Sequence, residues 1–481
     1  MHNGSAERAE VGSTTYGRIL RNRSFVALWL GQTISFIGDY FYWLAIPIMV
    51  EKLTGSALQV GLSVIATALP MLLLGPVAGV FVDRWDRKRT MIVADVLRGL
   101  LVLACLVVRT PEQVWIYYAV AFLMSCVSRF FFPAQNAVLP IIVPDKDDLL
   151  AANGLMQIVQ TAGLLIGPAL AGFSIGLWGE QVAFVVDSAT FFVSAAAILT
   201  MRFRVPHKRF RVSRQATEMA GRYVEIAAVW AEMREGVTYL FGNRTMVGIL
   251  LCMAVVQFGI GAINVIWVPF MQRTFGLGPE GLGAVDTAQG IGMALGGVML
   301  GFVVGRIRKK NLAGWCIVFI GGMIALMGLS PPFSLASLIP ALQGNVPLAE
   351  MTVGQRLLHM PLMLLAYSIL LGVALVPAQS AMMTMMQLAV PDLKRGRVGS
   401  ALNALTMAAG LISMAVSAAA GEVVGLRAIY VVSGLILSGA GLVGLLVLQE
   451  PEPQPDSLGH GQAAGEQRQE GEAEAMRVLA D

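Results

Sequence analysis

Charged residues are scarce in this chain of 481 amino acids. Only 13% of the residues are Asp, Glu, Lys or Arg, and 56% are hydrophobic. Soluble domains carry roughly 25% charged residues. This shortage excludes an ordinary soluble globular protein and indicates a chain that lies largely in an apolar medium. The small net charge of +4 gives no reason to expect a nucleic-acid partner.

Groups that bind metals or form disulfides are also scarce. The sequence has four histidines and four cysteines, and the cysteines all fall within apolar stretches (Cys105, Cys126, Cys252 and Cys316). Their spacing matches no metal site, so we expect them to pack as small apolar side chains without a disulfide. The chain also lacks a Walker-type phosphate loop. We therefore expect no metal, no cofactor, no ATP hydrolysis and no enzymatic activity.

Long apolar segments, in contrast, are abundant. A membrane-spanning helix needs roughly 20 apolar residues. Each such span is expected to be helical, because the bilayer offers no water to satisfy the backbone. We count twelve spans, at residues 24–50, 57–82, 90–109, 113–132, 152–178, 181–201, 245–272, 281–304, 312–329, 360–387, 398–420 and 427–448. The sequence therefore predicts an all-α polytopic protein of the lipid bilayer.

The distribution of Lys and Arg predicts the orientation of these spans. If both termini are cytoplasmic, the cytoplasmic segments before the tail hold 25 Lys and Arg residues and the outside loops hold five. Lys and Arg are enriched in cytoplasmic loops. We therefore expect both termini in the cytoplasm and a multi-pass protein of the plasma membrane.

The second half of the chain repeats features of the first. The hairpin after the second span contains Gly79 and Arg84, and a weaker copy contains Gly301 and Arg306. Other matched features are Asn22-Arg23-Ser24 with Asn243-Arg244-Thr245, Pro47 with Pro269, and Pro133-Ala-Gln-Asn-Ala137 with Pro377-Ala-Gln-Ser-Ala381. An ordered series of matches at nearly constant spacing indicates an internal duplication. Duplicated halves are one way in which transporters are built.

The spans and repeats together predict the domain organisation. We expect a cytoplasmic segment at 1–23, a six-helix half at 24–201, a cytoplasmic linker at 202–244, a second six-helix half at 245–448 and a disordered cytoplasmic tail at 449–481. The second half includes a long outside loop at 331–356, an insertion with no counterpart in the first half. The first 23 residues are too polar, and the apolar run after them too long, for a signal peptide.

The hairpin Gly79-x-x-x-Asp83-Arg84-x-Asp86-Arg87-Lys88-Arg89 resembles the signature of the major facilitator superfamily. The resemblance covers residues 20–448. Further fragments resemble the branch that contains macrolide-efflux proteins and the enterobactin exporter, among them Arg129-Phe-Phe-Phe-Pro133, Arg234-Glu-Gly236 and Arg395-Gly-Arg397. The resemblance implies the major facilitator fold and an exporter of small molecules in a bacterial inner membrane, commonly driven by proton antiport. We expect the protein to be a monomer.

The resemblance also implies a gating role for the hairpin. The gating residues would be Gly79, Asp83, Arg84, Asp86, Arg87 and Arg89. Asp83 is placed to hold a basic residue or a helix amino terminus of the other half, as a cytoplasmic latch in the outward-facing state. Gly75 and Gly79, four residues apart, predict a close approach between neighbouring helices. The alternative is that the basic residues only determine topology.

Carboxylates inside the predicted spans are candidates for proton coupling. A carboxylate at the middle of the bilayer costs roughly 2.5–3.5 kcal/mol on insertion scales, so each needs a partner or a function. Asp39 lies near the middle of the first span and is the leading candidate for a proton or cationic-substrate site. The alternative is a hydrogen-bonded structural carboxylate. Asp187 is the second candidate. It and Asp286 are expected nearer the outside ends, exposed at the mouth or helping to bind a cation.

Three further charged residues are expected near the cytoplasmic ends of their spans. Asp95 and Arg98 lie three apart on one helix face, which predicts an internal ion pair that helps gating. Arg129 partly resembles an arginine that drug antiporters use in proton transfer. The alternative is that its side chain snorkels to the membrane interface.

Two other sets of residues complete the expected site. A cavity for amphipathic compounds needs aromatic and amide side chains, and the candidates are Tyr40, Trp43, Gln135, Asn136, Gln157, Gln257, Asn264 and Gln289. The alternative for any one of them is that it faces lipid or the protein core. A run of small residues in the fifth span (Gly163, Gly167, Pro168 and Gly172) predicts tight helix packing and resembles a motif of antiporters.

Three functions remain open from the sequence. The first is a proton-coupled exporter of drug-like or siderophore-like small molecules. The second is a transporter that moves lysophospholipid between leaflets, which would not need a carboxylate in mid-membrane. The third is a non-transporting sensor, against which the absence of a soluble output domain argues. The direction of transport, as export, comes from the family resemblance.

Overall fold

The computed structural model describes residues 16–82, 84–202, 222–303, 305–331, 351–358, 360–391 and 394–448. Every regular element in these ranges is a helix. Parts of the predicted segments lie outside the described residues. They are the residues before 16, residues 203–221 of the linker, residues 332–350 of the insertion and the tail at 449–481; Asp83 of the hairpin is also outside.

In the described ranges, six long helices precede the linker and six follow it. The first six are α2 (Arg23–Thr54), α3 (Ala57–Val82), α4 (Arg87–Ala104), α5 (Trp115–Ile142), α6 (Lys146–Trp178) and α7 (Gln181–Thr200), with short 3-10 turns η1 (Cys105–Val107) and η2 (Pro111–Gln113). The later six are α10 (Arg244–Phe275), α11 (Pro279–Val303), α12 (Lys309–Leu329), α14 (Leu362–Ala389), α15 (Arg395–Val424) and α16 (Leu426–Val447). Two others, α9 (Arg222–Gly242) and α13 (Val353–Leu358), belong to the linker and the insertion.

Helices α2 and α10 show how the repeated residues act locally. Each helix is 32 residues long and contains one proline. The side chain of Asn22 accepts hydrogen bonds from the first backbone amides of α2, and Asn243 does the same for α10. Both helices end at a glycine with a left-handed backbone, Gly55 at φ 60° and Gly276 at φ 67°. Asparagine is a preferred amino-terminal cap and glycine a preferred carboxyl-terminal one, so the repeated residues specify two helices of the same length.

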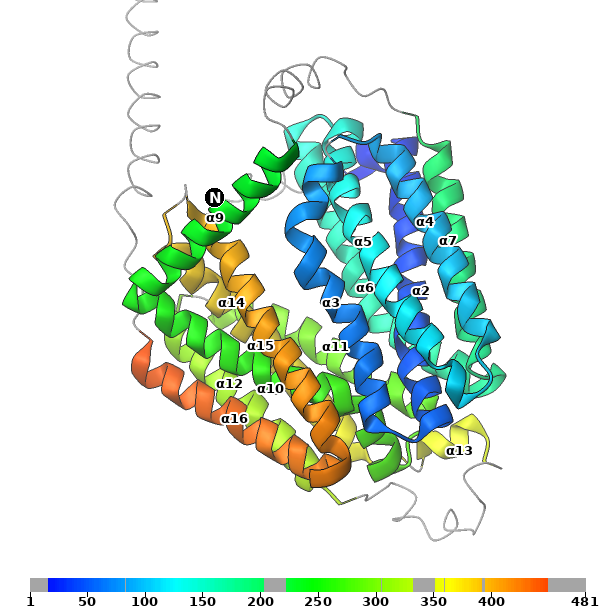
Figure 1. Ribbon diagram of the computed structural model, residues 1–481, viewed down its shortest axis with the longest axis vertical. Coiled ribbons are helices and arrows are strands. Elements are labelled where there is room, and N and C mark those ends of the chain that lie inside the picture. The colour runs from blue at the N-terminus through cyan, green and yellow to red at the C-terminus, as the bar shows by residue number, and fades with distance from the viewer. Residues whose placement is uncertain are drawn as a thin grey trace, which may run out of the picture.

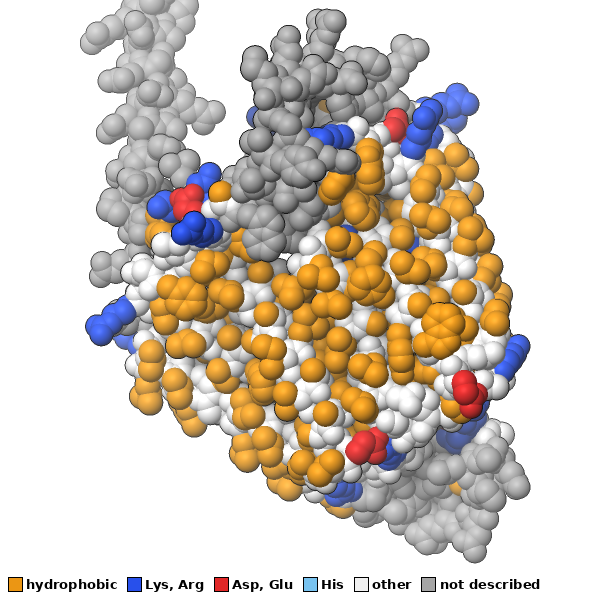
Figure 2. Space-filling view, in the orientation of Figure 1, with side chains coloured by type: hydrophobic (Ala, Val, Ile, Leu, Met, Phe, Trp, Pro, Cys, Tyr) orange, Lys and Arg blue, Asp and Glu red, His pale blue; other side chains and the backbone are white. Residues whose placement is uncertain are grey.

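Eleven helices in the described residues are long and apolar enough to cross a membrane. The sequence predicted twelve spans. The helix outside this set is α11, whose hydropathy is lowered by Asp286, Gln289 and several glycines. In Figure 2, hydrophobic side chains cover the middle of the visible face, and most Lys, Arg, Asp and Glu side chains gather toward its two ends. The chain is therefore an all-helical protein that crosses the membrane many times.

The long helices pack in two groups. The first group consists of helices α2–α7, which pack mainly on one another. The second group consists of α10–α12 and α14–α16, which also pack mainly on one another. The main contacts between the groups join α6 to α11 and α3 to α15. Figure 1 shows the groups side by side, with α9 at one end of the bundle and α13 at the other. We call these the α9 end and the α13 end.

The two groups meet most closely at the α13 end. A Cβ on Gly61 of α3 would overlap Ala418 of α15, and a Cβ on Gly172 of α6 would lie 2.5 Å from the Pro279 carbonyl oxygen of α11. At the α9 end, a Cβ on Gly75 or Gly79 of α3 would meet no described atom within 4 Å. The ribbons of the two groups also diverge toward this end (Figure 1). The structure is therefore closed at the α13 end.

Two helix boundaries differ from the prediction by more than five residues. The fourth span was expected to end before Pro133, but α5 continues through Pro133 and Pro140 to Ile142. The fifth was expected to begin at residue 152, but α6 begins at Lys146 behind the Asp145 cap. Proline is tolerated inside membrane helices because neighbours re-satisfy the freed backbone groups. The longer α5 places Gln135 and Asn136 on a helix.

Candidate functional site

A buried ion pair lies within the first group. Asp95 and Arg98 are both on α4, and their side chains form a hydrogen-bonded ion pair. Asp95 is 0% exposed and Arg98 is 4% exposed. The Arg98 guanidinium stacks on Phe131 of α5 and Phe191 of α7, at 4.5 and 4.4 Å from the ring centroids. Arg98 is therefore held by three helices of the first group.

Two more carboxylates, those of Asp187 and Asp39, interact electrostatically with Arg98. Asp187 of α7 is 0% exposed, and neither of its carboxylate oxygens has a hydrogen-bond partner among the described residues. Asp39 of α2 is half-buried. Arg98 interacts electrostatically with both, and Asp39 also interacts with Asp95 and Asp187. We call Asp39, Asp95, Arg98 and Asp187 the charge cluster, in which three carboxylates interact with one guanidinium.

The position of Asp187 corrects one expectation. Asp187 was expected nearer the outside end of its helix, either exposed at the mouth or helping to bind a cation. It does lie nearer the start of α7, but its side chain is completely buried, which excludes exposure at the mouth. The reason is packing: α7 lies against α2 and α4, and the neighbouring Ser188 hydroxyl donates to the Gly99 carbonyl oxygen of α4 at 2.9 Å. Asp286 of α11 is half-buried, and its Oδ2 has no hydrogen-bond partner in the described part of the chain.

Small residues bring the helices around the charge cluster together. A Cβ at Gly38, next to Asp39, would overlap Thr190 of α7. A Cβ at Gly167 of α6 would overlap the ring of Tyr40, and one at Gly163 would lie 3.5 Å from Phe36 Cβ. These glycines place α2 directly against α6 and α7. The contact with α7 brings Asp39 to the helix that carries Asp187.

The same run of small residues in α6 also makes the contact with the second group. Gly172 faces α11, where its Cα lies close to Gly283, and a Cβ on Gly283 would overlap the Pro168 carbonyl oxygen. The predicted packing motif thus touches α2 at Gly163 and Gly167 and touches α11 at Pro168 and Gly172. One helix therefore connects the surroundings of the charge cluster to the seam between the groups.

The described residues of the hairpin bind within their own group. Asp86 caps α4 by accepting a hydrogen bond from the Arg89 amide at 2.8 Å. Arg87 donates to the Ala137 carbonyl oxygen of α5 at 3.3 Å, and Lys88 donates to carbonyl oxygens at the end of α7. Arg84 is exposed. The close helix approach expected at Gly75 and Gly79 is absent among the described residues, because the groups diverge at this end.

Arg129 lies near the middle of α5, contrary to the expectation that it is close to the helix end. The difference follows from the continuation of α5 beyond Pro133. Arg129 is half-buried, and its Nε atom is buried without a hydrogen-bond partner among the described residues. Its side chain is therefore only partly solvated.

The predicted cavity residues divide between the two groups and the contact between them. Trp43 of α2 and Trp267 of α10 lie with their ring centroids 6.1 Å apart, across the boundary between the groups. Tyr40 and Gln289 are half-buried, Gln135 is buried, and Gln257 packs beside Gly410 of α15. Asn136, Gln157 and Asn264 are exposed. Trp267 of α10 thus joins Trp43 at the contact between the groups.

Two ion clusters at the α13 end were not anticipated. Arg273 of α10 pairs with Glu51 of α2 at 2.5 Å and lies 3.9 Å from Glu422 of α15. Arg356 of α13 lies 3.3 Å from Glu280 of α11. The partners in each pair lie far apart in the sequence. These pairs can be predicted only when it is known which helix ends lie next to each other in the folded protein.

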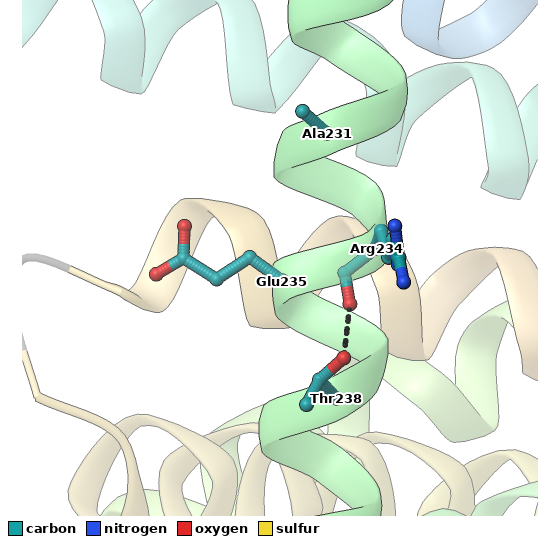
Figure 3. A pocket seen from close by; sticks show the side chains of 4 residues that line it. All are labelled: Ala231, Arg234, Glu235 and Thr238. Atoms are coloured by element: carbon teal, nitrogen blue, oxygen red, sulfur yellow. Dashed lines mark hydrogen bonds between the residues drawn. The ribbon is translucent and has the colours of Figure 1, made fainter.

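Two fragments singled out from the sequence meet at the α9 end. Glu235 of α9 pairs with Arg397 of α15 at 2.6 Å, and a Cβ on Gly236 would overlap the Arg397 carbonyl oxygen. Beside this contact is an open hollow of about 510 Å³, lined by Ala231, Arg234, Glu235 and Thr238. Figure 3 shows Arg234 and Glu235 pointing to opposite sides of α9, with Thr238 donating to the Arg234 carbonyl oxygen. The hollow is shallow and lies on the linker helix, apart from the charge cluster.

No group of three or more His, Cys, Asp or Glu side chains within the described ranges is arranged to hold a metal ion. The four cysteines are free and are buried or half-buried.

Known proteins resemble the chain in sequence and in fold. Macrolide efflux protein A of Streptococcus pyogenes is 26% identical over 320 residues, which cover 66% of this chain and 73% of that protein. Enterobactin exporter EntS of Escherichia coli O1:K1 / APEC is 24% identical over 328 residues, covering 67% and 73%. The crystal structure of a point mutant of the nucleoside transporter NupG superposes with a TM-score of 0.64 at 14% identity, covering 89% of this chain and 99% of that one.

The family model described as Major Facilitator Superfamily matches residues 28–342 and 249–477, which together span nearly the whole chain. The helical architecture and the superposition on NupG agree with that match. The chain belongs to the major facilitator superfamily and is a secondary transporter, not an enzyme.

Proposed function

We propose that this transporter exports amphipathic drug-like or siderophore-like small molecules in exchange for protons. The observation that supports coupling best is the charge cluster, in which Asp95 pairs with Arg98 and both Asp39 and Asp187 interact electrostatically with the same guanidinium. Burying three negative charges against one positive charge is costly. A proton on one of the carboxylates lowers that cost, and its release raises it. The cluster is thus suited to couple a proton to a conformational change.

Asp39 is the member of the cluster that can exchange a proton with solvent. It is half-buried, whereas Asp95 and Asp187 are both 0% exposed. Asp95 is already paired with Arg98. We infer that Asp39 gains and loses a proton during the transport cycle and that Asp187 takes part by exchanging that proton with Asp39. Tyr40, the next residue after Asp39, interacts electrostatically with both Asp39 and Asp286. Because Asp286 is on α11, Tyr40 connects the charge cluster to the second group.

The two groups supply the moving parts. In our proposal they are the duplicated six-helix halves at 24–201 and 245–448, joined by the linker at 202–244, with α11 as the twelfth span. The excess of Lys and Arg supports a cytoplasmic location for the α9 end, both termini and the tail at 449–481. The structure then has its closed end outside and represents the inward-facing state. A monomer in the plasma membrane contains every part this mechanism needs.

The hairpin is the proposed latch of the opposite state. When the α9 end closes, Gly75 and Gly79 would meet the second group, and Asp83 with Arg84 would bind across the seam. In the inward-facing state Asp86, Arg87 and Lys88 bind within the first group. This difference between the two states is what a latch requires.

The proposed substrate surface includes the aromatic and amide side chains near the boundary between the groups. Trp43 and Trp267 offer two large rings at this boundary. Polar groups are available on the same two helices, at Tyr40 of α2 and at Gln257 and Asn264 of α10, and on α11 at Gln289. Aromatic and amide groups together suit amphipathic ligands. The names of macrolide efflux protein A and enterobactin exporter EntS support the same class of substrate and the direction of transport.

Uptake into inverted membrane vesicles tests the proposal. With the vesicle interior made acidic, the wild-type protein should accumulate a macrolide or a cationic dye, and accumulation should stop when the gradient is collapsed. Asp39→Asn should insert normally and lose this accumulation. Movement of lysophospholipid alone, without dependence on the gradient, would contradict proton-coupled export and favour a lipid transporter.

A further inference from the structure

The insertion at 331–356 ends in a short helix that lies across a seam between the two groups. Helix α13 spans Val353–Leu358 and contacts both α6 and α11. These two helices belong to different groups and form one of the main contacts between them. Figure 1 shows α13 at the end of the bundle opposite α9. The end of the insertion therefore contacts the protein at the α6–α11 seam, which would have to open during the proposed transport cycle.

The end of the insertion is anchored by apolar and polar contacts. Met351, Val353 and Met360 are buried, although they flank an exposed turn. The Gln355 amide donates to Thr352 Oγ1 at 3.3 Å, and the Thr352 amide donates to Gln355 Oε1 at 2.9 Å. This reciprocal pair fixes the first turn of α13. Arg356 therefore projects from an ordered helix.

Arg356 reaches both sides of the seam at once. Its Nε lies 3.3 Å from Glu280 Oε1 on α11, and its Nη2 donates to the Gly176 carbonyl oxygen of α6 at 3.4 Å. The Arg356 side chain is 26% exposed and the Glu280 side chain is 2% exposed. Among the described residues, Arg356 is the only cation in an ion pair with Glu280. A buried carboxylate of the second group thus depends on the insertion for its counter-charge.

The surroundings of Glu280 tie this ion pair to the closed seam. A Cβ on Gly176 would lie 2.6 Å from Glu280 Oε2, so the absence of a side chain at Gly176 makes room for the carboxylate. Glu280 is the second residue of α11, where a negative charge favours the helix dipole. Separating α6 from α11 would break the bond to Gly176 and expose Glu280 to water. The Arg356 contacts therefore favour the arrangement in which the α13 end is closed.

We propose that α13 is a strap that holds the α6–α11 seam shut, with Arg356 as its clasp and Glu280 and Gly176 as its two anchor points. The insertion thereby controls how readily the transporter opens at the α13 end. This inference rests on the proposed alternating access, in which that end is extracytoplasmic. It gives Arg356 a gating role that does not depend on proton coupling.

Distances between the two groups test the strap without any transport assay. Spin labels are placed at Val107 in η1 and Val423 in α15, both exposed positions at the α13 end, in protein whose four native cysteines are replaced. Arg356→Gln should raise the ratio of long-distance to short-distance populations by about tenfold, as expected for a lost, partly buried charge pair. Arg427→Gln is the matched control, because it removes an exposed positive charge near the same end.

A double substitution separates gating from general stability. Glu280→Gln should shift the populations in the same direction as Arg356→Gln, and the two changes together should have nearly the effect of one, because both remove the same ion pair. An unchanged distance distribution in Arg356→Gln, or a lower unfolding temperature without a change in distances, would overturn the strap. A failed proton assay with shifted distances would instead refute proton coupling and leave the strap in place.

Discussion

Replacing Arg273 with methionine is expected to loosen the closed α13 end at the seam opposite the strap. Arg273 Nε and Nη2 reach the two oxygens of Glu51 at 2.5 and 3.0 Å, and Nη2 also donates to the Gly55 carbonyl oxygen at 2.7 Å. Glu51 and Gly55 belong to the first group, and Arg273 belongs to the second. These bonds all break when the groups separate at this end.

The size of the effect follows from how deeply the pair is buried. Removing one partner of a fully buried ion pair costs about 3–5 kcal/mol. The Glu51 side chain is 9% exposed but Arg273 is 32% exposed. Solvent therefore screens the pair, and we discount the cost to about 2 kcal/mol. Because the bonds exist only in the closed arrangement, that loss corresponds to about a 30-fold change in the ratio of closed to open molecules.

The labels at Val107 and Val423 measure this ratio directly. The wild-type distance distribution should be dominated by the closed arrangement, and Arg273→Met should add a clear longer component. Lys52→Met is the matched control: Lys52 is adjacent to Glu51, but its ammonium pairs with Glu180 at 2.8 Å within the first group. An unchanged distribution in Arg273→Met, or an equal shift in Lys52→Met, would refute the reasoning.

Three further predictions follow from the charge cluster, the packing motif and the hairpin. Asp187→Asn should keep the wild-type unfolding temperature, since the amide mimics a protonated carboxylate, yet reduce gradient-driven uptake at least about tenfold; unaltered uptake would exclude Asp187 from coupling. Gly167→Ala should cost about 1–3 kcal/mol of stability because its Cβ overlaps the Tyr40 ring, whereas Gly154→Ala in the same helix meets no described atom within 4 Å; equal unfolding temperatures would contradict the packing. Asp83→Lys should slow turnover while leaving equilibrium substrate binding intact, and a variant with normal turnover would reduce the hairpin to a topology signal.

The helices were predictable because their determinants are local. Asparagine caps such as Asn22 and Asn243, a left-handed glycine such as Gly55, and uninterrupted apolar runs can each be seen in a few neighbouring residues. The end of α5 was predicted wrongly because Pro133 reads as a stop in water, whereas tertiary contacts carry the helix through it. The hydropathy of α11 is reduced by polar residues such as Asp286 that face protein neighbours.

The charge cluster was only half predictable. Asp39 stood out because a carboxylate in the middle of an apolar run is rare, and the spacing of Asp95 and Arg98 on one helix face indicated an ion pair. The convergence of Asp187 with them depends on how α7 packs against α2 and α4, which no spacing along the chain encodes. The pairs at Arg273 and Arg356 depend on two distant segments meeting and were missed for the same reason.

Proton movement driven by substrate tests the central claim most directly. Purified protein is placed in liposomes that hold a pH-sensitive dye, and a macrolide gradient is imposed without a proton gradient. The account predicts that wild-type protein moves protons against the flow of macrolide, and that Asp39→Asn protein, folded and inserted to the same extent, moves none. Macrolide flux without proton movement in the wild type, or wild-type proton movement in Asp39→Asn, would contradict it.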